Sequence, residues 1–299
     1  MGVKMSNKLK IILIVVVALI LFNPISLEAI SNYIDNSFEY RNDNNNKVYY
    51  VENENIYLKD NIDNISEYDY PYYNLISQNE KIIYNQIYDN SMKLNEKFYP
   101  NIEINITEIK NAFEAFYNDH PEIFWINTNY TFRYNNEKIV KEVVISYNET
   151  INNLDYNKEL FDSEVNKILS KVNKYKDDYT KEKYIYDYLV NNVKYDKNAK
   201  MNQSAFSAIV NKESICAGFS RAFQYLMNKV GIKTFYAVGY SSTNHAWNIV
   251  YLNGNYYNVD LTWGTSDLTR YKYFNKSDSY FSKTHKRTGL TKLLPKCNR

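Results

Sequence analysis

Two short β-type runs joined by an Asn-Gly pair constrain the fold of this chain most tightly. The runs 245–251 and 256–260 are rich in aromatic and β-branched residues, and the tetrapeptide Leu-Asn-Gly-Asn joins them. A two-residue type I′ turn favours Asn-Gly, because both central residues need a positive φ. Such a turn makes Leu252 face Asn255, and every other pairing follows from that one. The sequence therefore predicts an antiparallel hairpin of known register.

The register decides which side chains share a face of this hairpin. Trp247 is expected to face Asp260, and His245 to face Thr262. Side chains alternate between the two faces of a strand, so His245 and Asp260 point to the same side as diagonal neighbours. Diagonal backbones lie about 7–8 Å apart, which lets a carboxylate reach the far nitrogen of an imidazole. Trp247 is expected to pack in the core.

A predicted amphipathic helix upstream of the hairpin carries a cysteine in its first turn. The residues of its apolar stripe are Phe219, Ala222, Phe223, Leu226 and Val230. Gly231 is expected to end the helix as residue C′. Ser214 is expected to be the N-cap, which places Cys216 where unpaired amides and the helix dipole favour a thiolate. A free cysteine more often packs as a small hydrophobe, so this signal is weak by itself.

Cys216, His245 and Asp260 together are the set of residues that a Cys-His-Asp triad requires. A thiolate at a helix start, set against a sheet face that carries an imidazole and a carboxylate, has the arrangement of such triads. Each residue has an ordinary alternative as a core cysteine, a satisfied histidine or a turn carboxylate. The coincidence of all three favours the triad.

Three motifs resemble those of the transglutaminase-like superfamily. Residues 216–223 (CAGFSRAF) resemble its nucleophile motif, 244–248 (NHAWN) its histidine motif and 256–263 (YYNVDLTW) its aspartate motif, in the family's order. Flanking features extend the resemblance over about residues 177–287, including Tyr273-Phe274 with His285. The segment DHPEIFW further upstream looks like a feature of some bacterial members.

The resemblance implies a papain-like α+β core in which a nucleophile helix packs on an antiparallel sheet. It also implies that Cys216 is the thiolate nucleophile, that His245 is its general base and later the acid, and that Asp260 holds the imidazolium. The oxyanion would bind the main-chain amide of Cys216, aided by the side chain of Gln203, which could instead only cap a turn. Trp263 is left open between a groove wall and the core.

No cofactor and no metal are expected. Three histidines and two cysteines are too few and too scattered for the usual four-ligand zinc site. His285, in a stretch rich in Lys and Arg, is expected to be solvated, and His120 before Pro121 is expected to mark a helix boundary. Cys297 is expected to be free, because a disulfide with Cys216 would silence the nucleophile.

The N-terminal residues 1–30 are expected to be a signal peptide or an N-terminal membrane anchor. Lysines precede the apolar run 11–22, which is too short to span a bilayer comfortably. Cleavage after Ala29 and retention as an anchor are both open. Either case makes the chain extracytoplasmic, secreted or anchored to the cell membrane, with membrane contact only through this segment if it is uncleaved.

The rest of the chain is expected to form a polar lead-in and two packed domains. Residues 31–66 are rich in Asn, Asp and Glu without a period, which is typical of a solvated lead-in. Residues 67–176 are expected to form a small α+β accessory domain, and residues 177–299 the transglutaminase-like domain. The helices are expected within 77–98 and over 106–117, 160–175 and 181–192, and β-type runs at 123–126, 130–134, 140–147 and 234–240.

Charge and chemistry limit the partners. Lys and Arg number 36 against 34 Asp and Glu, a net charge of +2 without long runs of one sign, so nucleic acid is not an expected partner. The resemblance implies thiolate attack on a protein or peptide amide, with cell-wall peptides among the candidates. The thioester would pass to water, as in a protease or amidase, or to an amine, as in a transglutaminase. The alternative is a non-catalytic transglutaminase-like binding or scaffolding module at the cell surface.

Overall fold

Residues 70–299, the part of the chain that the computed structural model describes, form two larger sheets, a two-stranded parallel sheet of β4 and β5, and the helices packed on them. All of these residues belong to one compact unit, Leu58–Arg299. The predictions for residues 1–30 and 31–66 fall outside the described residues. Within 70–299 the helices are too short or too polar to cross a membrane.

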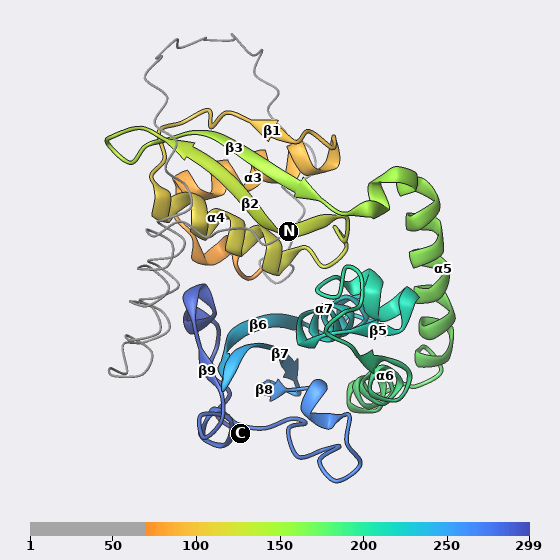
Figure 1. The fold of residues 1–299 in the computed structure, drawn as a ribbon. Helices are drawn as coiled ribbons and strands as arrows, with labels where there is room; N and C mark the ends of the chain where they lie inside the picture. The colour runs from red at the N-terminus through yellow and green to blue at the C-terminus, as the bar shows by residue number, and fades with distance from the viewer. Residues whose placement is uncertain (1–69) are drawn as a thin grey trace, which may run out of the picture. The chain divides into compact units, whose positions relative to one another are not determined.

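The N-terminal part of the described chain is a three-stranded antiparallel sheet of order β1-β3-β2, packed with helices α3 and α4 (Figure 1). Its elements are η1 (Tyr73–Leu75), α3 (Gln78–Met92), β1 (Lys97–Phe98), α4 (Ile106–Asp119), β2 (Ile126–Tyr134), β3 (Val140–Tyr147), η2 (Glu149–Asn153) and α5 (Leu154–Val172). Local sequence starts both packed helices, because Ser77 with Glu80 and Asn105 with Glu108 form capping boxes.

The prediction of a separate β-type run at 123–126 is wrong. Only Ile126 lies in a strand, as the first residue of β2, and the three residues before it are buried in a turn. The Trp125 indole nitrogen donates to the carbonyl of Ser91 at 3.1 Å, which fixes this turn against α3. A short apolar run looks the same in sequence whether it is buried as a strand or as a turn.

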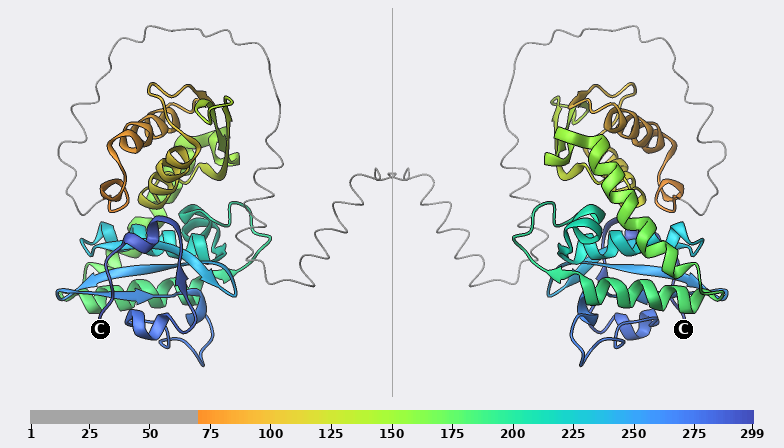
Figure 2. Two further views of the ribbon diagram at one scale, coloured as in Figure 1. Left: turned by 90° about the vertical axis from the view of Figure 1, so that its left-hand side faces the viewer. Right: turned by 90° about the vertical axis from the view of Figure 1, so that its right-hand side faces the viewer.

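The C-terminal part is a four-stranded antiparallel sheet of order β8-β7-β6-β9 (Figures 1 and 2). Its elements are α6 (Asp178–Asn192), β4 (Lys194–Tyr195), η3 (Ser207–Asn211), β5 (Glu213–Ser214), α7 (Cys216–Lys229), β6 (Thr234–Ser241), β7 (Thr243–Leu252), β8 (Asn255–Val259), η4 (Thr262–Gly264), α8 (Asp278–Phe281), β9 (Lys286–Arg287) and η5 (Gly289–Leu293). Helix α7 packs on β6 and β7. The predicted α+β core, a nucleophile helix on an antiparallel sheet, is confirmed.

The β7–β8 hairpin has the predicted register. Leu252 pairs with Asn255, and the pairing continues in step to Val259, the last residue of β8. The two turn residues have φ values of 50° and 80°, as a type I′ turn requires. One detail differs from the prediction: Asp260 and Thr262 lie beyond the strand, so they are not in cross-strand pairs.

The end of α7 is as predicted and its beginning is not. Gly231 is residue C′ with φ 79°, and its amide donates to Asn228 in a Schellman motif. Ser214 is not the N-cap, because it belongs to β5 and its hydroxyl donates to the carbonyl of Asn202. Ile215 is the N-cap instead, and no side chain caps it within the described part of the chain.

Polar side chains of α7 join the two parts of the unit. The guanidinium of Arg221 donates to the carbonyl of Tyr117 and stacks 3.4 Å from the centre of that ring. Gln224 donates to the carbonyl of Asn118 at 2.9 Å. Both carbonyls belong to the last turn of α4, so side chains of α7 cap the C-terminal end of α4. The domain boundary between residues 176 and 177 stays a prediction, and α5 runs from one part to the other (Figure 1).

A glycine lets the first turn of α7 approach the loop before β5. A Cβ atom on Gly218 would overlap the hydroxyl oxygen of Ser214 and lie 2.7 Å from the carbonyl oxygen of Ser204 and 2.8 Å from that of Asn202. Main-chain atoms cannot move aside as a flexible side chain does. The amide of Ile215 also donates to Asn202 at 3.1 Å, which holds the start of α7 on this loop.

Gly218→Ala is therefore expected to lower the free energy of unfolding by about 1–3 kcal/mol, the usual cost of overpacking. An exposed helical Gly→Ala change would raise it by about 1 kcal/mol, so the two effects have opposite signs. Urea denaturation measures the change, and Lys229→Ala, at an exposed position of the same helix, is the matched control. A more stable Gly218→Ala variant would contradict this packing.

Candidate active site

The three predicted site residues meet where α7 begins above the β7–β8 hairpin. Cys216 is the first residue of α7, His245 lies in β7, and Asp260 follows β8 directly. The Nε2 atom of His245 lies 2.7 Å from Oδ2 of Asp260. Cys216 is close enough to His245 to help raise the pKa of the imidazole. Because Nε2 bonds to Asp260, the other ring nitrogen, Nδ1, is the one left for the thiol.

The cysteine and the histidine of the site are both largely buried. Cys216 is 9% exposed, and it packs with Ala217, Tyr236 and Ala246 in a small apolar cluster. The side chain of His245 is also 9% exposed. Both residues thus keep a small contact with solvent, whereas the side chain of Asp260 is only 1% exposed.

The electrostatics of the site favour a charged imidazole. Burial by itself lowers the pKa of His245, but the hydrogen bonds and charges of Asp260 and Cys216 outweigh it and raise that pKa to about 10. Burial would raise the pKa of Asp260, and the hydrogen bonds from His245 and His285 hold it well below its ordinary value instead. The pair is thus an imidazolium beside a carboxylate over the neutral pH range.

Every lone pair of the Asp260 carboxylate has a donor. Oδ1 accepts from the Thr262 hydroxyl at 2.9 Å and from the Trp263 amide at 3.1 Å. Oδ2 accepts from His245 and, at 3.1 Å, from Nε2 of His285. The carboxylate is almost fully buried, with 1% of its side chain exposed, so these donors replace the water it has lost.

The prediction that His285 is solvated is wrong. Its side chain is 1% exposed and lies among aromatic rings beside Asp260. The lysines and arginine around it in sequence indicated the surface, and Lys283 and Lys286 are indeed exposed, but His285 between them is not. One signal was present: the motif resemblance includes His285 among the flanking features. His120 does mark the end of α4, as predicted, although it too is buried.

Three of these residues could also gather a cation. His245, Asp260 and His285 each offer one ligand atom, and these atoms lie within 4.8 Å of one another. Nitrogen and carboxylate ligands of this kind suit zinc and related metals. The hydrogen bonds described above already use the same atoms. The expectation of no metal and no cofactor stays a prediction.

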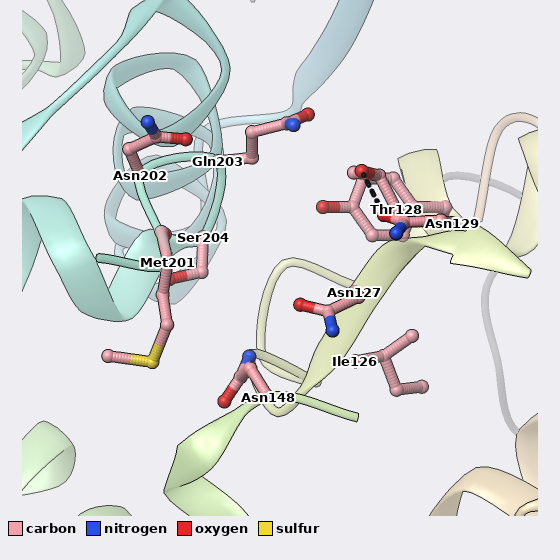
Figure 3. Close-up of a pocket in the computed structure, with 10 residues that line it drawn as sticks. Ile126, Asn127, Thr128, Asn129, Asn148, Met201, Asn202, Gln203 and Ser204 are labelled. Carbon is pink, nitrogen blue, oxygen red and sulfur yellow. Dashed lines mark hydrogen bonds between the residues drawn. The ribbon is translucent and has the colours of Figure 1, made fainter. Parts of the chain in front are cut away.

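Gln203 lies on the loop against which α7 begins, and it lines a pocket there. The pocket has a volume of about 170 Å³ and runs between this loop, the start of β2 and the end of α4 (Figure 3). Its lining residues are Tyr117, Ile126, Asn127, Thr128, Asn129, Asn148, Met201, Asn202, Gln203 and Ser204. Gln203 is exposed, and among residues 70–299 its side-chain amide has no hydrogen-bond partner. Its predicted part in an oxyanion hole stays a prediction.

The remaining candidates divide between core and site. Trp247 packs in the core, as predicted, and its indole nitrogen donates to Asn258 at 3.1 Å. Trp263 is half-buried, and its ring centre lies 6.1 Å from that of His245. Cys297 is free, as expected, but it is buried rather than on the surface.

Comparison with known proteins gives a family for this part of the chain. Residues 165–261 match the family model of the transglutaminase-like superfamily. The matched residues include the cysteine, the histidine and the aspartate of the site. No curated protein matches the chain.

Three solved structures resemble the chain in part. They are a TGase (15% identity, 56% of this chain and 50% of that chain, TM-score 0.32), a candidate cysteine protease from Cytophaga hutchinsonii (18%, 45%, 61%, 0.31) and a candidate protease from Parabacteroides distasonis (12%, 44%, 33%, 0.27). The chain thus spans 33% to 61% of the length of these proteins. By the family match, residues 165–261 of this chain are similar to the transglutaminase-like superfamily.

Proposed function

We propose that the chain is an exported cysteine-dependent enzyme that transfers acyl groups from protein or peptide amides through a thioester. The observation that carries the proposal is that the imidazole of His245 lies 2.7 Å from the buried Asp260 carboxylate, and that the neighbouring Cys216, the first residue of α7, helps to raise the pKa of that imidazole. A thiol, an imidazole and an orienting carboxylate in that order are the parts of a Cys-His-Asp triad.

The geometry supports a two-step reaction. In the first step the Cys216 thiolate attacks the amide carbonyl carbon, and the His245 imidazolium gives its proton to the departing nitrogen, which leaves an acyl thioester and an amine. In the second step His245 takes a proton from water or from an acceptor amine, which attacks the thioester and releases the thiolate. Asp260 keeps the imidazole oriented through both steps.

The developing oxyanion would bind at the start of α7. No side chain caps this helix within the described residues, so the first main-chain amides, beginning with that of Cys216, are available as donors. Gln203 lies on the adjoining loop and would supply a second donor if its side chain turned toward the sulfur. This role for Gln203 belongs to the proposal.

The pocket between the loop 201–204 and the start of β2 has a lining that suits a peptide. Its lining has many side-chain amides and hydroxyls but no charged residue. Groups of this kind bind the main-chain amides of a peptide through paired donors and acceptors and do not require a charged ligand. Peptides of extracellular proteins and of the cell wall both satisfy this chemistry. Both water and an amine fit as acceptors, so the proposal covers a protease, an amidase and a transglutaminase.

Export rests on the sequence of the N-terminus. The apolar run 11–22 after lysines is typical of a signal peptide or an anchor, and these residues lie outside the described part of the chain. The proposal places the enzyme outside the cytoplasmic membrane, where protein and cell-wall peptides are available as substrates.

Iodoacetamide is expected to alkylate Cys216 at about pH 5.5, where an ordinary thiol of pKa about 8.5 is only about one-thousandth ionised. The imidazolium of His245 stabilises the thiolate, so His245→Ala and His245→Gln are expected to slow the reaction at that pH by at least about tenfold. Mass spectrometry of the labelled chain measures the rate.

Cys297 provides an internal control in the alkylation experiment. Burial raises its pKa to about 12, so it is expected to stay unlabelled in the folded chain. Cys216→Ser should abolish labelling, and urea midpoints show whether the His245 variants fold. Labelling of Cys216 no faster than that of an ordinary thiol would favour the non-catalytic binding module instead.

The His245–Asp260 pair is expected to stabilise the fold in a defined pH window. The pKa of His245 rises from 6.5 to about 10 on folding, so its contribution is complete below about pH 6.5 and is lost as the pH rises toward 10. The lowered pKa of Asp260 gives a contribution that is present above its ordinary value and lost in stronger acid. Urea midpoints of the wild type and His245→Gln should therefore converge between about pH 6.5 and 10. A constant difference would contradict the raised pKa.

A glutamine-containing peptide, incubated with the chain with and without a primary amine, is expected to change mass. Deamidation, cleavage and an amine adduct each give a different mass, so one spectrum separates hydrolysis of the side chain, hydrolysis of the backbone and cross-linking. Cys216→Ser is the control and should give no product. The enzyme proposal would be contradicted if the peptide stayed unchanged and Cys216 were also alkylated no faster than an ordinary thiol.

A further inference from the structure

We propose that His285 is a positioning residue that shares the Asp260 carboxylate with His245 and sets how strongly that carboxylate holds the imidazole. The inference rests on the proposed function, because it deepens the account of the same site. Its basis is that the Nε2 atoms of two histidines approach one oxygen, Oδ2 of Asp260, at 2.7 Å and 3.1 Å.

The first role of His285 is to fix which way the carboxylate points. Thr262 and the Trp263 amide hold Oδ1 from within the turn that follows β8. Without a second donor, Oδ2 would depend on His245 alone, the residue that must exchange its proton during catalysis. His285 takes no part in that exchange, so its hydrogen bond would keep Oδ2 in place at every step.

The hydrogen bonds of His285 show which ring nitrogen serves Asp260. Nδ1 lies 2.8 Å from the hydroxyl oxygen of Thr284, and Nε2 lies 3.1 Å from Asp260. A carboxylate oxygen only accepts, so Nε2 carries a proton and donates it to Asp260. The hydroxyl of Thr284 is the partner of Nδ1 and holds the ring in this orientation.

The surroundings of His285 exclude a direct catalytic role. Its ring centre lies 4.5 Å from that of Phe281, 4.8 Å from Trp263 and 5.2 Å from Trp247, and its side chain is 1% exposed. Its ring centre lies 5.4 Å from that of His245. His285 is thus enclosed by rings and acts on the reacting atoms only through Asp260.

The second role is electrostatic. A donor on Oδ2 partly neutralises the carboxylate, so it weakens the attraction of Asp260 for the proton on His245. The titratable groups that face this network are His245 from β7 and Tyr273, whose ring centre lies 5.5 Å from that of His285. The phenols of Tyr186 and Tyr195 also feel the charge of Asp260. In the adjoining β9, Arg287 is paired with Asp278 of α8 at 2.7 Å, and Lys286 is exposed.

Two substitutions separate the hydrogen bond from the packing. His285→Phe keeps an aromatic ring among aromatic rings and removes the donor. His285→Gln keeps a donor near the position of Nε2 and gives up the ring. A purely structural role predicts that the ring matters, whereas the positioning role predicts that the donor matters.

The decisive measurement is the titration of His245 by NMR of ¹⁵N-histidine-labelled full-length chain in a Cys216→Ser background, with a chelator present. His285→Phe is expected to raise the midpoint by about 0.5–1 pH unit, because the carboxylate loses a donor, and His285→Gln is expected to return it close to the parent value. An unmoved midpoint in His285→Phe, or an equal rise in both variants, would overturn the inference.

Iodoacetamide labelling of the same His285 variants with Cys216 intact keeps the two proposals apart. If the wild type shows no labelling in mild acid, the proposed function fails, and the NMR midpoints still decide the role of His285. If the wild type is labelled, the second rise in rate at alkaline pH, where His245 loses its proton, should move upward in His285→Phe and not in His285→Gln. His285→Phe could instead lower the thermal stability and leave the pH of the alkaline increase in labelling rate unchanged. His285 would then be a packing residue, and the inference would be overturned.

Discussion

The buried carboxylate of Asp260 is the constraint on which the rest of the site depends. An ion removed from water costs several kcal/mol unless hydrogen bonds and opposite charge replace the hydration. Here the donors come from the turn after β8, from β7 and from the segment before β9. Satisfying one side chain therefore fixes three segments that are separate in sequence. It also holds one nitrogen of the His245 imidazole and leaves the other free.

A second constraint is steric and places the sulfur. The first turn of α7 lies so close to the loop before β5 that Gly218 has no room for a Cβ atom. Further along the same helix, Arg221 and Gln224 cap the end of α4. The N-terminal part of the unit is therefore hydrogen-bonded to α7. The accessory elements thus form part of the scaffold of the site, and the amide-lined pocket lies at this junction.

Local rules explain why so much of the site could be predicted from the sequence. A type I′ turn fixes a register by itself, so the hairpin brought His245 and Asp260 together as expected. The Schellman motif at Gly231 likewise depends on residues close in sequence. Ser214 failed as an N-cap because pairing of β5 with β4 uses its backbone, and that pairing joins segments that are not neighbours in the chain.

By itself, then, the sequence determined the hairpin, the helix that follows Ile215 and the candidate site residues, because turns and side-chain alternation act over a few residues. Only the tertiary structure decided that the turn at 123–125 is buried, that Gly218 is wedged against a loop, and that His285 shares the carboxylate of Asp260. Lysines and an arginine beside His285 indicated the surface, but burial depends on which distant segments pack on a residue. In the folded chain, the buried His285 donates a hydrogen bond to the buried carboxylate of Asp260, which needs donors in place of water.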